Sequence, residues 1–248
     1  MKRFTVTAGA ASTMAIIAAA PGFAQDDVKV LSNWAYDDLY AEGWSVDVML
    51  SSTEVIDVTG EDIGDIENII FSNDGEVLGI IAEVGGLWDI GDTHVHVPWD
   101  EITMNDGIQQ VQVPVTEDTV DDYDVFNGLW GAEQVIAEDA TESTQAVDDN
   151  LEAGSGIFKA SDLIGSYAYL SDDVRYGYIS DIIVEDKAIA AIVTDAAAYG
   201  RSGYYAYPYD YRGVPPIGTT RYDLPYDSGE IDTLDSFDYE QLQSRVAE

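Results

Sequence analysis

Short apolar runs separated by Gly, Asn, Asp and Pro dominate the pattern along the chain. The runs at 53–59, 65–71, 77–84, 94–98 and 110–115 are rich in β-branched residues and partly alternate apolar with polar positions. This period of two predicts strands. In "VHVPWD" (95–100), Val95 and Val97 point to one face and His96 to the other, and Pro98 ends the ladder because it has no N–H. The pattern predicts a mainly β protein.

The pattern occurs twice. "GDIENII" (64–70) corresponds to "GYISDII" (177–183), and "VHVPWD" corresponds to "YAYPYD" (205–210), so equivalent positions lie 110 to 113 residues apart. Alternation breaks after Ile66 and again after Ile179, and Gly64 and Gly177 stand just before these breaks. A shared irregularity next to glycine predicts a β-bulge in each copy. We therefore expect a duplicated unit of the size of one small domain.

The segment 60–102, "GEDIGDIENIIFSNDGEVLGIIAEVGGLWDIGDTHVHVPWDEI", resembles the PRC-barrel domain family. The second copy opens with "KASDLIGSYAYL" (159–170), which is typical of that family, and keeps the proline–aspartate ending. It departs where "DAAAYG" (195–200) replaces the Gly-Gly turn. The resemblance implies a small closed β-barrel in each copy that serves as a binding module. It implies no catalytic residues and no cofactor.

The expected fold is therefore mainly β, with two tandem PRC-barrel-like domains and short helices after a cleaved signal peptide. Trp34, Tyr36, Leu39 and Tyr40 predict one helical face that packs on the first barrel. Short surface helices are expected at 116–126 and 131–140. The predicted organisation is a signal peptide (1–24), a lead-in (25–44), a first barrel (45–140), an acidic linker (141–156) and a second barrel (157–248).

The N-terminal pattern predicts export. Lys2 and Arg3 precede an apolar stretch densest at 14–20, and Gly22 and Ala24 provide the small residues of a cleavage site before Gln25. We expect a periplasmic protein, with an extracellular one as the alternative, and no stable membrane insertion after cleavage. An uncleaved anchor is the other interpretation of the same segment. The absence of cysteine excludes thiol catalysis, zinc–thiolate sites and iron–sulfur clusters.

The net charge of the chain limits the classes of partner that it can bind. The net charge of −38 becomes −40 without residues 1–24, because they carry two basic and no acidic residues. Such a charge excludes nucleic acid and disfavours anionic membrane surfaces. It keeps a protein soluble, and a saline habitat is one interpretation of it. Binding of divalent cations is another, although no acidic run matches the spacing of a calcium-binding loop.

The two histidines, His94 and His96, are the first candidates for chemistry. No G-x-S-x-G motif accompanies them and the second copy has no counterpart, so we expect no enzyme. Asp92, His94 and His96 alternate on one strand face, and this spacing could hold a divalent transition metal. The simpler interpretation of these three residues is a solvated outer face.

Tyrosines are concentrated in the second copy, where 13 of 16 lie after residue 150. Alignment of the copies places Tyr205, Tyr207 and Tyr222 at positions equivalent to interior valines. Four others replace polar residues of the first copy: Tyr167, Tyr178, Tyr204 and Tyr211. These four are expected to face outward and bind a partner, although packing on the linker, the terminal helix or the first barrel is the alternative.

The function that we predict is exported, non-enzymatic binding or scaffolding. The partner would be another protein of the cell envelope or a second copy of the chain. The alternative function is that of an acidic periplasmic protein that binds divalent metal ions or calcium.

Overall fold

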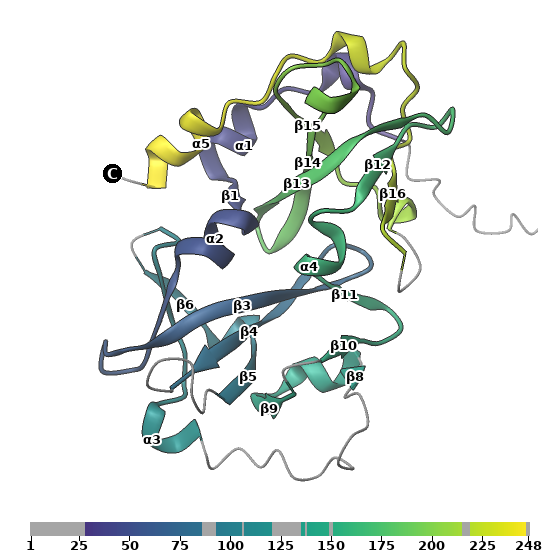
Figure 1. Cartoon of the computed structure of the whole chain (residues 1–248). Coiled ribbons are helices and arrows are strands. Elements are labelled where there is room, and N and C mark those ends of the chain that lie inside the picture. Colours follow the sequence, from purple (N-terminus) through teal and green to yellow (C-terminus); the bar gives the residue numbers. More distant parts are fainter. Residues whose placement is uncertain are drawn as a thin grey trace, which may run out of the picture.

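The computed structural model describes residues 28–85, 93–105, 107–120, 135–136, 138–148, 151–214 and 219–246. Within these ranges the chain is mainly β and forms two large sheets, one above the other in Figure 1. The predicted signal peptide lies outside the described residues.

The first sheet has the strand order β6-β7-β2-β3-β4-β5-β9, and β11 also pairs with β3. Pairing between β2 and β7 is parallel, whereas β2–β3, β3–β4 and β4–β5 are antiparallel. Its strands are β2 (Glu54–Ile56), β3 (Asp62–Ser72), β4 (Val77–Val84), β5 (Thr93–Pro98), β6 (Thr103–Asn105), β7 (Gln110–Gln112), β9 (Gln145–Val147) and β11 (Ile157–Lys159). The five strand runs predicted for the first copy all contain observed strands.

The second sheet repeats this order as β15-β14-β13-β12-β16, and β1 also pairs with β13. Pairing between β12 and β16 is again parallel, as it is between β2 and β7. Its strands are β1 (Trp44–Ser45), β12 (Tyr167–Tyr169), β13 (Arg175–Glu185), β14 (Ala188–Asp195), β15 (Tyr204–Pro208) and β16 (Arg221–Asp223). In the part of the chain that is described, no pairing joins β15 to β16, so strand pairing does not close this sheet into a ring.

Each long strand carries the predicted irregularity. The register shifts between Ile66 and Asn68 in β3 and between Ile179 and Asp181 in β13, which confirms a bulge in both copies. Gly64 has φ +152°, and a Cβ there would lie 1.9 Å from the carbonyl oxygen of Glu83. Only glycine allows the neighbouring strand to approach this closely.

The two halves exchange their leading segments. The strand β1 and helix α2 (Val46–Ser52) precede the first sheet, yet β1 pairs with β13 of the second sheet. Conversely, β11 precedes the second sheet and pairs with β3 of the first, and it leads into helix α4 (Ala160–Leu163). Both helices lie between the sheets in Figure 1. One hydrophobic core therefore runs through both halves, from Val55 and Ile69 to Ile182 and Tyr207.

The lead-in packs on the second half, so the prediction that it packs on the first barrel is wrong. It forms η1 (Leu31–Asn33) and α1 (Asp37–Glu42). Trp34 Nε1 donates to the carbonyl oxygen of Ala206 at 2.9 Å, and the Tyr36 ring lies 5.3 Å from that of Phe237. The edge of β15 needs polar partners, and the lead-in provides them. Order along the chain does not reveal which sheet offers a free edge.

The segment predicted as a linker adds structure to the first sheet. β9 pairs with β5, and β10 (Glu152–Ala153) pairs with β8 (Val135–Ile136). A second apolar cluster, which includes Ile81, Ile136 and Val147, covers the outer face of this sheet. The alternating apolar residues of this segment are too few to predict strands. The domain boundaries themselves stay a prediction.

Short helices complete the fold. The helix predicted at 116–126 is observed in part, as α3 (Glu117–Val120). Of the helix predicted at 131–140, the structure shows the start of η4 (Glu138–Glu142), whereas 135–136 form strand β8. Residues 121–134 and 137 lie outside the described residues. The other helical segments are η2 (Trp99–Glu101), η5 (Ala197–Tyr199), η6 (Tyr211–Gly213), η7 (Ile231–Thr233) and α5 (Tyr239–Val246). In η2, Trp99 stacks on Trp44 at 5.5 Å between ring centroids, so it packs against the exchanged segment.

Candidate interaction surface

A row of paired residues crosses the outer face of each sheet at an equivalent position. In the first sheet the row is Gln110, Glu54, Asp65, Glu83 and His94. In the second it is Arg221, Tyr167, Tyr178, Asp195 and Tyr204. Directly paired residues point to the same face of a sheet. In the observed register Tyr167, Tyr178 and Tyr204 therefore stand in the second sheet where Glu54, Asp65 and His94 stand in the first, and Tyr178 and Tyr204 are exposed.

Tyr167 and Tyr178 belong to a compact aromatic cluster. Their ring centroids lie 4.9 Å apart, and the ring of Tyr199 lies 6.3 Å from that of Tyr178. The guanidinium carbon of Arg175 lies 4.9 Å from the Tyr167 centroid and 5.1 Å from the Tyr199 centroid. Tyr178 remains 37% exposed, while Tyr167 and Tyr199 are half-buried. We call Tyr167, Tyr178, Tyr199 and Arg175 the tyrosine–arginine cluster.

Sequence reasoning missed two members of this cluster. Tyr199 stands in "DAAAYG", the segment noted only as a departure from the family pattern. Arg175 begins β13, where the first copy has Asp62 at the start of β3. A change from acidic to basic residue at this equivalent position was a signal that the sequence offered. Tyr169 is similar, because it is half-buried and has Arg221 at 4.0 Å over its ring.

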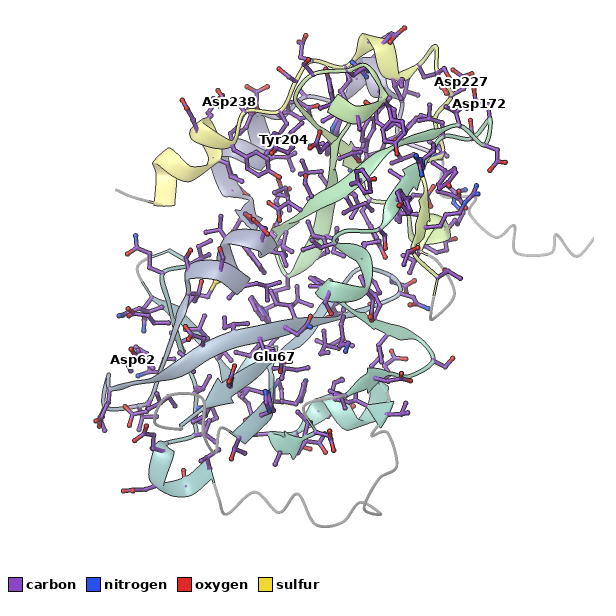
Figure 2. All side chains as sticks on the ribbon, viewed as in Figure 1. Asp62, Glu67, Asp172, Tyr204, Asp227 and Asp238 are labelled. Carbon is purple, nitrogen blue, oxygen red and sulfur yellow. The ribbon has the colours of Figure 1, made fainter. Side chains whose placement is uncertain are left out.

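Tyr204 and Tyr211 lie apart from the cluster. Tyr204 is 39% exposed, and its ring meets that of Tyr239 in α5 edge-on at 4.8 Å. Figure 2 shows Tyr204 on the side of the molecule where the C-terminal segment with Asp238 runs. Tyr211 is 47% exposed and follows the opposite end of β15, in η6. The structure therefore joins Tyr167 with Tyr178, places Tyr204 two strands from Tyr178 in the same row, and separates Tyr211 from all three.

The tyrosines predicted as interior are buried. Tyr205 is 7% exposed, and Tyr207 and Tyr222 are 0% exposed, which confirms that prediction. The Tyr207 hydroxyl donates to that of Tyr176 at 2.7 Å, and Arg201 Nη1 donates to the same Tyr176 oxygen at 3.1 Å. Burial raises the pKa of Tyr207 far above its usual value, so the phenol stays neutral.

A polar groove of about 390 Å³ borders the same half of the molecule. Both of its arginines are neutralised locally, because Arg212 pairs with Asp210 at 2.6 Å and Arg221 pairs with Asp223 at 2.7 Å. The groove is lined by Val28, Leu170, Ser171, Asp173, Asp210, Arg212, Gly213, Arg221, Asp223, Leu224 and Pro225. Both arginines of the groove are therefore already paired with its three aspartates.

The histidines occupy two different environments. His94 Nε2 lies 3.4 Å from Glu67, and its side chain is partly exposed. His96 is fully buried beneath β9, so the interpretation as a solvated outer face is wrong for this residue. Burial lowers the pKa of His96, and its Nδ1 lies 3.4 Å from the carbonyl oxygen of Ser143. Asp92 lies outside the described residues, and those that are described contain no cluster of three or more His, Cys, Asp or Glu fit to hold a metal ion.

The fold so far defines a mainly β protein built from two sheets of the same strand order. Residues 50–120 match the PRC-barrel domain family. This match covers the central strands of the first sheet and confirms the resemblance for that part of the chain. No curated protein matches the chain. Among the described residues, no helix has the length and apolar character to cross a membrane.

Proposed function

We propose that this protein is an exported binding or scaffolding protein without catalytic activity. Its second half would be a divergent second PRC-barrel module. The outer face of this second sheet would contact an envelope protein. The observation that carries the proposal is the change of chemistry between the two equivalent rows, from Glu54 and Asp65 in the first sheet to Tyr167 and Tyr178 in the second.

The chemistry of this face supports a protein contact. Tyrosine and arginine are the residues that most often dominate binding energy at interfaces, because they offer a large area with few rotatable bonds. Tyr178 and Tyr204 keep more than a third of their surface exposed within the described structure. An exposed aromatic side chain that packs on neighbouring rings is already ordered, so binding costs less conformational entropy.

The differences between the two sheets support different roles for the two halves, one in stability and one in binding. Both sheets are needed for one shared core, since β1 with α2 and β11 with α4 are exchanged between them. Only the second sheet, however, carries the tyrosine–arginine cluster on its outer face. The first sheet covers part of its own outer face with the segment that follows it along the chain. The first half would thus stabilise the protein while the second half binds.

The test compares substitutions at equivalent positions of the two rows. Tyr178→Ser combined with Tyr204→Ser should abolish retention of the partner from an envelope extract by the tagged protein. The matched control is Asp65→Ser combined with His94→Ser, the equivalent positions of the first row, which should leave retention unchanged. Tyr211→Ser should also leave it unchanged, because Tyr211 lies apart from the row. Circular dichroism and melting temperature verify that each variant is folded.

Equal retention by the tyrosine variant and the wild type would refute the proposed surface. Export is tested separately by the intact mass of the protein recovered from the periplasm, which should begin at Gln25. The cation-binding alternative stays a prediction, and calorimetry with calcium, zinc and copper tests it.

A further inference from the structure

Arg175 differs from the other arginines whose side chains the structure describes. Arg201 donates to the carbonyl oxygens of Ile231 and Leu234, and Arg212 and Arg221 pair with aspartates. Arg175 has no hydrogen-bond or ion-pair acceptor among the described residues, although the chain contains 48 acidic residues. Its only close partners in the described structure are the two tyrosine rings.

The two rings hold this guanidinium without neutralising it. Tyr167 and Tyr199 both lie about 5 Å from it, at 4.9 and 5.1 Å, so they attract the cation through their π-systems. The residue is exposed, and its N–H donors remain available to solvent. A planar guanidinium fixed by aromatic contacts is prepared to bind a carboxylate with two parallel hydrogen bonds.

We propose that Arg175 anchors a carboxylate side chain of the protein partner. This inference rests on the proposed function and specifies the chemistry of the partner at that surface. The carboxylate would lie on Arg175, and the neighbouring apolar groups of the partner would cover the ring of Tyr178. The contact would therefore be a charge-assisted pair at the centre of an aromatic patch.

The charges around the tyrosine–arginine cluster indicate which charges the partner should carry next to its carboxylate. Asp195 pairs with Tyr178 in the sheet and makes no ion pair among the described residues, whereas Asp223, which pairs with Tyr169 in the sheet, is neutralised by Arg221. A partner surface that is complementary to this arrangement has an acidic group for Arg175 and a lysine or arginine beside it that faces Asp195. A net-basic protein fits, whereas a second copy of this chain, with a net charge of −38, would repel the acidic surroundings.

A pair of short peptides tests the carboxylate directly. The probes are Lys-Leu-Glu-Leu-Lys and Lys-Leu-Gln-Leu-Lys with blocked ends, which share size and hydrogen-bonding shape but differ by one negative charge. The full mature chain should bind the Glu peptide about tenfold more tightly, as expected for one charged hydrogen bond. Arg175→Gln should abolish this preference. Arg212→Gln is the matched control and should keep it, because Arg212 is already paired with Asp210 and lies in η6, apart from the row.

Equal affinity of the wild type for the two peptides, or binding of neither, would overturn the inference. Retention of the envelope partner separates this failure from failure of the proposed function. If the tyrosine variant loses the partner while Arg175→Gln keeps it, the proposed binding surface is supported and the proposed role of Arg175 is refuted. If both variants keep the partner, the proposed function falls as well. A covalent dimer obtained by photo-crosslinking at Tyr178 would identify a second copy as the occupant and would also contradict a net-basic partner.

Discussion

Asp181 in β13 and Asn68 in β3 each accept a hydrogen bond from the first turn of a helix that belongs to the other half. The Asp181 carboxylate accepts a hydrogen bond from the backbone N–H of Asp47 at 2.9 Å, at the start of α2. The Asn68 amide oxygen accepts one from the N–H of Ser161 at 3.3 Å, at the start of α4. Both residues stand at the β-bulge, so each bulge fixes the helix that arrives from the other half.

The charge of Asp181 makes one of these contacts sensitive to pH. Burial, opposed by hydrogen bonds from Ser45, Asp47 and Ile182, raises the pKa of the Asp181 carboxyl to about 7. The unfolded chain releases this proton near pH 4. Between these two pH values the Asp181 carboxyl is ionised in the unfolded chain but still protonated in the folded chain. The contribution of Asp181 to stability is therefore fully present below about pH 4 and is lost as the pH rises to about 7.

The variant Asp181→Asn should remove the pH-dependent loss of stability, because an amide does not titrate. It should keep the hydrogen bonds to α2, because the amide of Asn68 makes the equivalent hydrogen bonds to α4. The difference in unfolding free energy between variant and wild type should grow in favour of the variant from pH 4 to pH 7. The expected slope is about 1.4 kcal/mol per pH unit or less. Urea titrations at several pH values measure it.

Asn68→Asp is the reciprocal control. It introduces a buried carboxyl at the other bulge and should destabilise the protein more at pH 8 than at pH 4. A difference between Asp181→Asn and wild type that stays constant across this range would show that Asp181 does not titrate in the folded state as its burial implies.

The sequence predicted the local features of the fold well, because these depend on residue types within a few positions. Alternation and the glycines before Ile66 and Ile179 located the strands and both bulges. Such features need only the period of the strand and the steric needs of glycine.

Several long-range contacts escaped prediction because they join residues far apart in the chain. Tyr36 was expected on the first barrel, yet its hydroxyl donates to the carbonyl oxygen of Asp235 at 2.9 Å. His96 was expected in solvent, yet β9 covers it. A pattern shows that a face or an edge requires a partner, but it does not show which of two equivalent sheets provides one. The basic residue at Arg175 was visible in the sequence, but its contact with the ring of Tyr199 in η5 was not.

The hairpin between β13 and β14 offers a stabilising substitution. Asp186 and Lys187 have φ values of 46° and 67°, which are left-handed conformations that non-glycine side chains rarely adopt. Asn-Gly is the sequence that two-residue hairpin turns of this kind prefer. Asp186→Asn with Lys187→Gly should raise the unfolding free energy by about 1 kcal/mol, because left-handed backbone is costly for L-residues. Thermal unfolding measures the gain.

The double change also removes the exposed ion pair between Lys187 and Asp100, whose loss should matter little. Asp100→Ala in the wild-type background isolates that loss. If the Asn-Gly variant is less stable than Asp100→Ala, then the side chains at this turn contribute more than the backbone conformation costs.

The docking of the lead-in on β15 should depend on one hydroxyl. The backbone N–H of Ala206 is buried and donates to the Tyr36 hydroxyl at 3.3 Å. Tyr36→Phe would leave this N–H without its acceptor, and we expect a loss of about 1 to 3 kcal/mol in unfolding free energy. Tyr40→Phe is the matched control, because its hydroxyl accepts from the exposed N–H of Asp238, which water can replace. Similar losses for the two variants would refute this account of the edge.

The net charge of −38 should make the folded chain more stable as salt is added. Carboxylates repel one another over the compact surface, and the repulsion weakens once the Debye length falls to about 10 Å at 0.1 M salt. The melting temperature at pH 7 should rise as sodium chloride increases from about 0.02 to about 0.3 M, a range chosen to span that screening length. Each kcal/mol gained corresponds to roughly 2 to 4 °C for a chain of this size. The same titration near pH 4, where many carboxyls are protonated, is the control and should give a smaller rise. A flat or falling curve at pH 7 would mean that repulsion among the 48 acidic residues is already offset locally, as it is for Asp210 by Arg212.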